Sequence, residues 1–177
     1  DFKMDDSTFG LLGVSGSGKS MTLKCISGIE TPDRGRIVLN GRVLFDSNEK
    51  INVPIRERRV GFLFQNYALF PNMTVKQNIA FGLHKIASKD EIQNTVEKEI
   101  ELMELNGLEN RYPRELSGGQ QQRTALARAL VVKPEILLLD EPFSALDEHL
   151  RKQMTKKLKN DISVFSGTTI FVTHNMA

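Results

Sequence analysis

The sequence predicts an α/β fold in which a mainly parallel sheet is flanked by helices, with a small antiparallel β element and an inserted helical segment. Three observations predict it. Short apolar runs alternate with segments of helical periodicity, as expected where helices join parallel strands. One run, at residues 136–139, is apolar without interruption, which is typical of a strand buried on both faces. Asn40-Gly41, between two strand-like runs, is the strongest short signal of a hairpin.

The first part of the chain predicts a strand, a helix, an antiparallel pair and a second parallel strand, from apolar periodicity and the flanking turn residues. In order, these elements occupy residues 9–12, 21–26, 36–39 with 43–45, and 60–64. Gln65 directly follows the last of them. The chain therefore opens with a strand and a helix joined by a glycine-rich turn.

The middle of the chain predicts mainly helices. Ser88 and Glu91 form a capping box at the start of a helix over residues 88–105, which Asn106-Gly107 is expected to end. The core face of that helix is expected to hold Ile92, Val96, Ile100 and Met103. A second capping box at residues 117–120 begins a helix that ends before Pro134.

After this segment the pattern returns to strand, helix and strand, at residues 136–139, 148–162 and 168–173, and His174 follows the last strand. We expect one domain over residues 1–177, with a core of about residues 1–65 and 134–177 and a helical subdomain of about residues 66–133. The chain begins at Asp1 without a methionine and stops just after an apparent strand, so we expect the domain to be truncated at both ends.

Composition narrows the function. The 177 residues carry a net charge of +2, with basic and acidic residues interspersed, so no nucleic-acid partner is expected. A single cysteine excludes an internal disulfide. No apolar run approaches the ~20 residues of a membrane-spanning helix, so a membrane role must come through a partner protein.

The most informative segment is the glycine-rich turn between the first strand and the first helix. Its residues are Gly13, Val14, Ser15, Gly16, Ser17, Gly18, Lys19 and Ser20. Such a turn directs backbone N–H groups and the positive end of a helix dipole at one point, where an anion binds. Lys19 can neutralise the β- and γ-phosphates of a nucleotide, and the Ser20 hydroxyl can hold Mg²⁺. The alternative, a glycine-rich loop that matches by chance, is made rarer by the flanking strand and helix.

Two further segments carry chemistry. At the end of the buried run, Asp140 is suited to orient Mg²⁺ and Glu141 to position or deprotonate an attacking water. Taken alone, they would more simply be two acids that end a strand, but the phosphate-binding turn favours the magnesium role. Ser117-Gly118-Gly119-Gln120 opens a helix with two glycines and is a second place for an anion, although an ordinary capped helix would look the same.

The order of these motifs resembles the nucleotide-binding domain of ATP-binding cassette (ABC) transporters over essentially the whole chain. GVSGSGKS at 13–20 is similar to the Walker A loop, ILLLDEP at 136–142 to Walker B, and LSGGQQQR at 116–123 to the signature sequence of the family. Gln65 matches the Q-loop, Ser144-Ala145-Leu146-Asp147 the D-loop, and His174 the switch histidine. Walker motifs are shared by many NTPases, whereas LSGGQ between them is highly specific.

The resemblance implies a P-loop NTPase core that hydrolyses ATP with Mg²⁺ and forms a head-to-tail dimer with a second ATPase subunit. Each ATP would lie on residues 13–20 of one subunit and be closed over by residues 117–120 of the other. The resemblance further implies catalytic roles for Glu141, His174 and Gln65, a nucleotide contact for Asp147, and Mg²⁺ contacts for Ser20, Gln65 and Asp140.

The resemblance also implies an importer's ATPase subunit, bound to transmembrane permease subunits at the cytoplasmic face of the cell membrane and serving a solute-binding protein indirectly. Residues 66–75 look most like importers of oxyanions, iron or polyamines, and residues 36–45 like the molybdate or sulfate group. The aromatic residues at 66–71 are either a surface for the membrane subunit or local core. A soluble cassette ATPase of DNA repair or translation is the alternative. A module that binds nucleotide without hydrolysis is a third, against which Glu141 and His174 argue.

Overall fold

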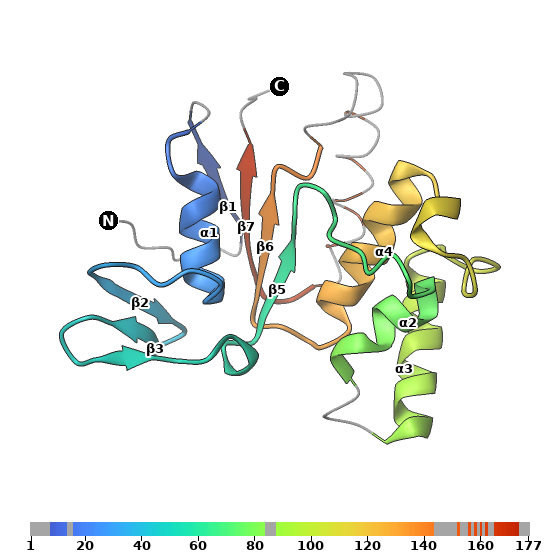
Figure 1. The fold of residues 1–177 in the computed structure, drawn as a ribbon, viewed down its shortest axis with the longest axis horizontal. Helices are drawn as coiled ribbons and strands as arrows, with labels where there is room; N and C mark the ends of the chain where they lie inside the picture. The colour runs from blue at the N-terminus through green and yellow to red at the C-terminus, as the bar shows by residue number, and fades with distance from the viewer. Residues whose placement is uncertain are drawn as a thin grey trace.

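A computed structural model describes residues 8–13, 16–83, 88–143, 152, 156, 158, 160, 162 and 165–173 of the chain. Its main sheet has four parallel strands in the order β1-β7-β6-β5, so the predicted parallel sheet is confirmed (Figure 1). The strands are β1 (Thr8–Leu12), β5 (Val60–Leu63), β6 (Ile136–Asp140) and β7 (Thr168–Thr173). All five residues of β6 are buried, as expected for a central strand of an uninterrupted apolar run.

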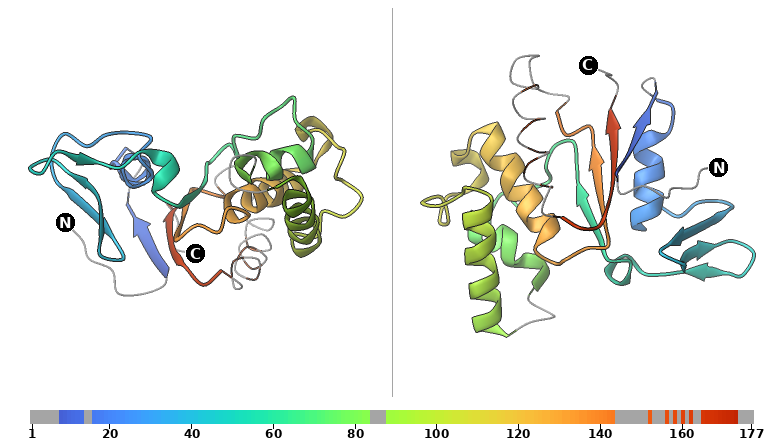
Figure 2. Two further views of the ribbon diagram at one scale, coloured as in Figure 1. Left: turned by 90° about the horizontal axis from the view of Figure 1, so that it is seen from below. Right: turned by 180° about the vertical axis from the view of Figure 1, so that it is seen from behind.

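Helices α1 (Lys19–Ser27) and α4 (Gly118–Leu130) cover opposite faces of this sheet. Successive side chains of a strand point to opposite faces. Ile136 and Leu138 of β6 pack with Leu23 of α1, whereas Leu137 and Leu139 belong to the cluster that includes α4. Figure 1 and the right panel of Figure 2 show the two helices on either side of the strands.

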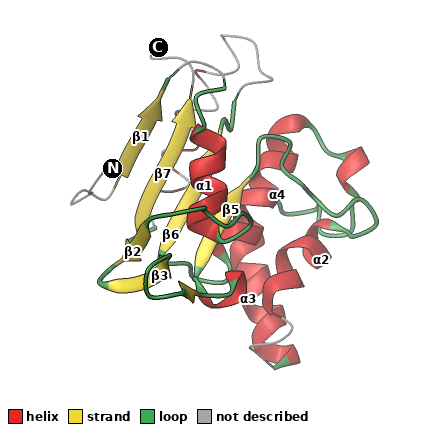
Figure 3. Ribbon diagram, turned by 60° about the vertical axis from the view of Figure 1, so that its left-hand side comes forward, coloured by secondary structure: helices red, strands yellow, loops and turns green. Residues whose placement is uncertain are grey.

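A separate antiparallel sheet has the order β2-β3-β4, with β2 (Arg36–Leu39), β3 (Arg42–Asp46) and β4 (Ile51–Asn52). The hairpin predicted at Asn40-Gly41 is confirmed, and both turn residues have positive φ angles, 50° and 78°. The two-residue strand β4 was not predicted. Figure 3 shows this sheet near the end of the parallel strands opposite to their arrowheads.

Arg58 joins the antiparallel sheet to α1. It follows the 3₁₀ turn η1 (Ile55–Glu57) and its side chain is fully buried. Nη1 donates to the carbonyl oxygens of Cys25 and Ile26 at 2.8 and 3.0 Å, at the end of α1. Nε donates to the Val53 carbonyl at 2.7 Å, and Nη2 to Asn52 Oδ1 at 2.7 Å. One guanidinium therefore satisfies oxygens from the helix and from the sheet.

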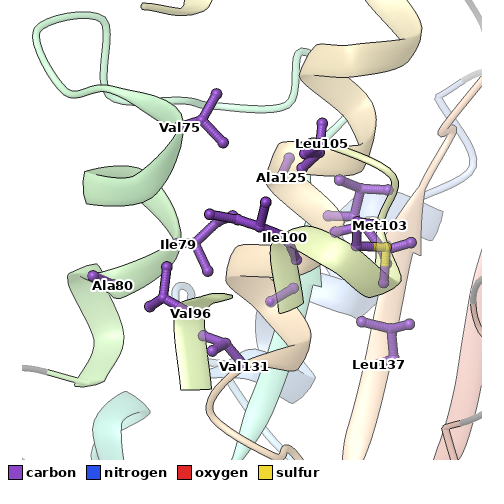
Figure 4. Close-up of a cluster of buried hydrophobic side chains, with 14 of the residues drawn as sticks. Val75, Ile79, Ala80, Val96, Ile100, Met103, Leu105, Ala125, Val131 and Leu137 are labelled. Atoms are coloured by element: carbon purple, nitrogen blue, oxygen red, sulfur yellow. The ribbon is translucent and has the colours of Figure 1, made fainter. Parts of the chain in front are cut away.

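The helical segment contains α2 (Val75–Ala80), the 3₁₀ turns η2 (Phe81–Leu83) and η3 (Pro113–Glu115), α3 (Lys89–Leu102) and α4. Figure 4 shows its buried side chains, among them Val75, Ile79, Val96, Ile100 and Met103. The same cluster continues to Leu63, Leu137 and Leu139 of the parallel sheet. The helices and the sheet thus share one hydrophobic core.

The capping boxes predicted at Ser88 and Ser117 are confirmed, but the predicted end of α3 is wrong. The helix ends at Leu102, before Asn106-Gly107. Leu105 N–H donates to the Ile100 carbonyl at 2.9 Å, and Glu104 N–H to the Glu101 carbonyl at 3.0 Å. This is the Schellman pair of hydrogen bonds, with Glu104 in the left-handed position at φ 53° where glycine is usual.

Part of the predicted helix at 148–162 is described, and residues 152, 156, 158, 160 and 162 are helical as expected. The rest of that segment lies outside the described residues. Among the described residues, no helix combines the length and the apolar composition of a bilayer-spanning segment.

Candidate nucleotide-binding site

The carboxyl ends of the four parallel strands form one edge of the sheet, and several of the predicted site residues lie at or just after those ends. Gly13 follows β1, Asp140 closes β6, and Glu141 comes next. Gln65 and Glu141 each stand two residues beyond the last paired position of β5 and β6. Sites of open α/β sheets lie at this edge, so the topology gathers residues far apart in sequence.

The glycine-rich turn leaves the beginning of α1 open. Gly16 and Gly18 have φ angles of 80° and 85°, a left-handed conformation that glycine adopts without steric cost. No side chain caps the helix at Gly18, and its first turn contains no acid. The first N–H groups of α1 and the positive end of its dipole are therefore available to an anion. Val14 and Ser15, also predicted here, lie outside the described residues.

Lys19, the first residue of α1, folds back across the turn. Its side chain is largely buried, with 9% of the residue exposed. Nζ donates to the Gly13 carbonyl oxygen at 2.7 Å and lies 3.2 Å from Ser17 Oγ. The ammonium group is thus held at the mouth of the turn, beside the N–H groups. A phosphate bound there would meet a positive charge and a set of backbone donors together.

Ser20 and Asp140, both predicted as Mg²⁺ contacts, are in direct contact. Ser20 Oγ donates to Asp140 Oδ1 at 2.7 Å, and Asp140 is only 6% exposed. A hydroxyl and a carboxylate are hard oxygen ligands that suit Mg²⁺. No group of three His, Cys, Asp or Glu residues able to hold a metal ion occurs in the described part of the chain. The pair fits Mg²⁺, which usually takes several of its ligands from phosphate and water.

Glu141 has a left-handed backbone, with φ 46°. Its N–H donates to the Val172 carbonyl oxygen of β7 at 3.1 Å, which fixes this turn against the neighbouring strand. Its side chain is half-buried, while Gln65 is exposed. A strained non-glycine residue at a strand end is typical of functional sites. Asp147 and His174 lie outside the described residues.

The second predicted anion site is a well-formed helix beginning. Ser117 Oγ accepts from Gln120 N–H at 3.3 Å, and Ser117 N–H donates to Gln120 Oε1 at 2.9 Å. Gly118 is exposed, and a Cβ added there would meet nothing within 4 Å. Because α4 and α1 cover opposite faces of the sheet, the chain separates this helix end from the Lys19 turn.

Two polar residues near the site were missed in the sequence. Arg128 of α4 and the fully buried Asn78 of α2 both bind the loop that follows Gln65. Arg128 interrupts an apolar stretch of α4, which was its only signal, whereas Asn78 ends the polar run Lys76-Gln77-Asn78 and gave none. That signal does not name a partner 60 residues away.

Comparison with known proteins decides the family. A family model described as ABC transporter matches residues 4–144. The chain belongs to the ABC transporter family. The sulfate/thiosulfate import ATP-binding protein CysA of Synechococcus elongatus is 51% identical over 173 residues, which are 96% of this chain and 48% of that protein. CysA of Caulobacter vibrioides is 50% identical over 176 residues, 97% of this chain and 50% of that protein.

Two other relatives support membership of the ABC transporter family. A probable sulfate/thiosulfate import ATP-binding protein CysA of Chlorella vulgaris is 48% identical, over 96% of this chain and 70% of its own length. The dimeric structure of the ATP-binding cassette MJ0796 in a post-hydrolysis state, bound to ADP and Pi, superimposes with a TM-score of 0.75 at 32% identity. The match covers 96% of this chain and 75% of that one. The chain spans about half the length of the two bacterial relatives named above.

Proposed function

We propose that this chain is the ATP-binding and ATP-hydrolysing part of a subunit that powers the import of a solute across a membrane. The observation that carries the proposal is the contact between Ser20 and Asp140 beside the buried Lys19. It supports the proposal because a turn suited to phosphate and two oxygen atoms suited to Mg²⁺ lie at one edge of the sheet. The names of the relatives favour an importer over a soluble cassette ATPase of DNA repair or translation.

Each residue of the site has a role in this proposal. Lys19 and the N–H groups of α1 bind the β- and γ-phosphates. Ser20, Asp140 and Gln65 hold Mg²⁺, which neutralises charge on the phosphate oxygens when bound. Glu141 orients the attacking water and accepts its proton, and His174 contacts the γ-phosphate. Asp147 contributes a nucleotide contact across the subunit interface.

We further propose a head-to-tail dimer in which two ATP molecules lie at the interface. The Lys19 turn and the Gly118 helix end begin helices on opposite faces of the sheet, which supports a site shared between two copies over one built within a single chain. Two copies related by a two-fold axis bring each turn to the other copy's helix end. ATP then joins the subunits, and loss of the γ-phosphate after hydrolysis weakens the interface.

Mixed subunits of the full-length protein test the shared site. One population carries Lys19→Met and the other Gly118→Asp, both with Glu141→Gln to prevent turnover. Asp suits the first turn of a helix, so Gly118→Asp keeps α4 folded while it repels phosphate. Neither population alone should retain ATP through gel filtration. The mixture should, because a heterodimer has one intact site, whereas a site built within one chain would not be restored.

The partners and the solute follow from the same proposal. The subunit binds transmembrane permease subunits at the cytoplasmic face of the membrane, and a solute-binding protein delivers sulfate or thiosulfate to them. Uptake of radiolabelled sulfate by a sulfate-transport-deficient strain that expresses the full-length protein and its permease tests this. Uptake of molybdate but not sulfate would change the solute, and no uptake with intact ATPase activity would favour the soluble alternative.

A further inference from the structure

The loop that follows Gln65 has a strained backbone. Tyr67 and Ala68 are consecutive residues with positive φ angles of 60° and 43°. The left-handed conformation brings Cβ too close to the following carbonyl oxygen, so residues with side chains avoid it. Such a path persists only where surrounding contacts hold it.

Arg128, near the end of α4, makes those contacts. Its Nη2 donates to the Tyr67 carbonyl oxygen at 2.9 Å, and its Nη1 to the Ala68 carbonyl oxygen at 2.8 Å. The guanidinium also lies over the Phe70 ring, with Cζ 5.2 Å from the ring centroid. The planar fork of arginine binds two successive carbonyls through two nitrogens in a fixed geometry, which the single nitrogen of lysine does not provide.

These hydrogen bonds matter to the arginine as well. Arg128 is half-buried, and this burial lowers the pKa of its guanidinium. Within the described ranges, no carboxylate forms an ion pair with it. A partly buried cation without an acid depends on hydrogen bonds to offset its desolvation. The arginine and the left-handed loop therefore stabilise each other.

Asn78 fixes the remainder of the loop to α2. Its Oδ1 accepts from Phe70 N–H at 2.9 Å. Its Nδ2 donates to the carbonyl oxygens of Phe70, Met73 and Thr74 at 3.2, 2.9 and 3.1 Å. With this second half anchored, the segment between Gln65 and Phe70 is held by Arg128 and by two short-range backbone hydrogen bonds. Tyr67 N–H donates to the Phe64 carbonyl oxygen at 2.9 Å and Ala68 N–H to the Asn66 carbonyl oxygen at 2.7 Å, so Arg128 supplies the contact from a distant element.

We propose that Arg128 is a positioning residue for Gln65. Because Arg128 belongs to α4, it links Gln65 to residues 117–120 at the beginning of that helix. Tyr67 and Ala68 are the second and third residues after Gln65, so holding their carbonyls orients Gln65 at the sheet edge. The inference rests on the proposed function, in which Gln65 serves the ATP of its own chain. In the proposed dimer, α4 begins at the partner's ATP, so Arg128 connects the two nucleotides.

Steady-state ATPase kinetics of the full-length protein test this inference. We expect Arg128→Lys to lower kcat by about tenfold and to leave KM for ATP within about twofold, because the phosphate-binding turn is untouched. In a Gln65→Ala background, Arg128→Lys should change kcat by less than about twofold, since an arginine that acts through Gln65 has nothing left to orient. Adding Ala68→Gly to the Arg128→Lys variant that retains Gln65 should recover part of the lost kcat, because glycine adopts the left-handed backbone without the hydrogen bonds from Arg128.

Arg42 provides the matched control. It also binds two successive carbonyl oxygens, those of Glu57 and Arg58 at 2.7 and 3.0 Å, but in the antiparallel sheet. Arg42→Lys should leave kcat within about twofold. If Arg128→Lys does not fold, Phe70→Leu is tested instead, because it removes the ring under the guanidinium. It should lower kcat by less than Arg128→Lys, and the loss should disappear in the Gln65→Ala background.

The outcomes separate the inference from the proposed function. Equal losses of kcat with and without Gln65, or an unchanged kcat in Arg128→Lys, would overturn the role of Arg128 alone. A Gln65→Ala variant with full activity would overturn the role proposed for Gln65 and this inference with it.

Discussion

Ser20 Oγ and Asp140 Oδ1 lie 2.7 Å apart, in a hydrogen bond between residues 120 positions apart in the sequence. The bond joins the first turn of α1 to the end of β6. If these two oxygens hold Mg²⁺ as proposed, the fold has already brought them together, and less free energy would be spent on ordering side chains.

Asp140→Asn should raise the Mg²⁺ concentration for half-maximal ATPase activity by about tenfold, because a neutral amide oxygen attracts the ion less than a carboxylate. ATP binding without Mg²⁺ should remain within about twofold, since Lys19 is unaffected. Titration of Mg²⁺ at saturating ATP measures the first, and fluorescence of a nucleotide analogue the second. Asp46→Asn is the control, as Asp46 is equally buried, at 7% exposed, but belongs to β3. An unchanged Mg²⁺ requirement would exclude Asp140 as a ligand.

Glu141→Gln should lower turnover by at least about a hundredfold, because the amide keeps the shape of the side chain but cannot accept a proton. ATP affinity should stay within about twofold, and the dimer should persist in MgATP, as seen by size exclusion with light scattering. The control is Glu135→Gln, which removes the acid just before β6, where Glu135 pairs with Arg59 and Arg42. Undiminished hydrolysis would remove Glu141 from the catalytic role.

Gly28→Ala should destabilise the protein more than Gly107→Ala. Both glycines have similar φ angles, 86° and 81°. A Cβ at Gly107 meets nothing within 4 Å, so that variant should lose only about 1 kcal/mol of unfolding free energy for the backbone. A Cβ at Gly28 lies 2.7 Å from Arg58 Nε, and it would displace a buried guanidinium at a further cost of about 2 kcal/mol. Urea unfolding measures the loss of unfolding free energy in both variants. Equal losses would contradict the close packing of the Arg58 guanidinium on Gly28.

Glu99 of α3 should make stability depend on pH. Burial raises its pKa from 4.5 to about 7, and among the described residues its buried Oε1 has no hydrogen-bond partner. Between these values the folded protein binds more protons than the unfolded chain, so the free energy of unfolding falls as pH rises. The stabilising protonated form is complete below pH 4.5 and is lost through about pH 7.

Glu99→Gln should therefore gain stability over the wild type as pH rises from about 4.5 to 8, by about 1–2 kcal/mol once the partial solvent contact of Glu99 is allowed for. Urea unfolding at several pH values measures the difference. Glu97→Gln, on the exposed side of the same helix, controls for the loss of one acid from α3. A pH-independent difference between Glu99→Gln and the wild type would show that the carboxyl titrates alike in both states.

Features with strong local signals could be predicted from the sequence. Asn40-Gly41 gave the hairpin because both residues accept positive φ, and the Ser88 and Ser117 boxes gave the helix starts because their partners are three residues away. The glycine-rich turn and the two acids at the end of the buried run could be recognised for the same reason, because each motif is contiguous. They predicted that the site lies at the carboxyl edge of the sheet.

Features that depend on contacts between distant residues could not be predicted from the sequence. The end of α3 depends on Glu104, whose carboxylate binds Arg123 of α4 at 3.0 Å. No local rule predicts that a glutamate will take the left-handed position there. Arg58 and Arg128 bind carbonyl oxygens, which every residue carries, so the sequence does not name their partners. Only the folded chain identifies these contacts.

Arg58 connects the antiparallel sheet to the end of the helix that begins at Lys19. Helix α1 has 9 residues, with Lys19 at its start and the carbonyl oxygens bound by Arg58 at its end. Loss of the Arg58 side chain would therefore leave carbonyl oxygens unpaired at the far end of the helix whose first residue is Lys19.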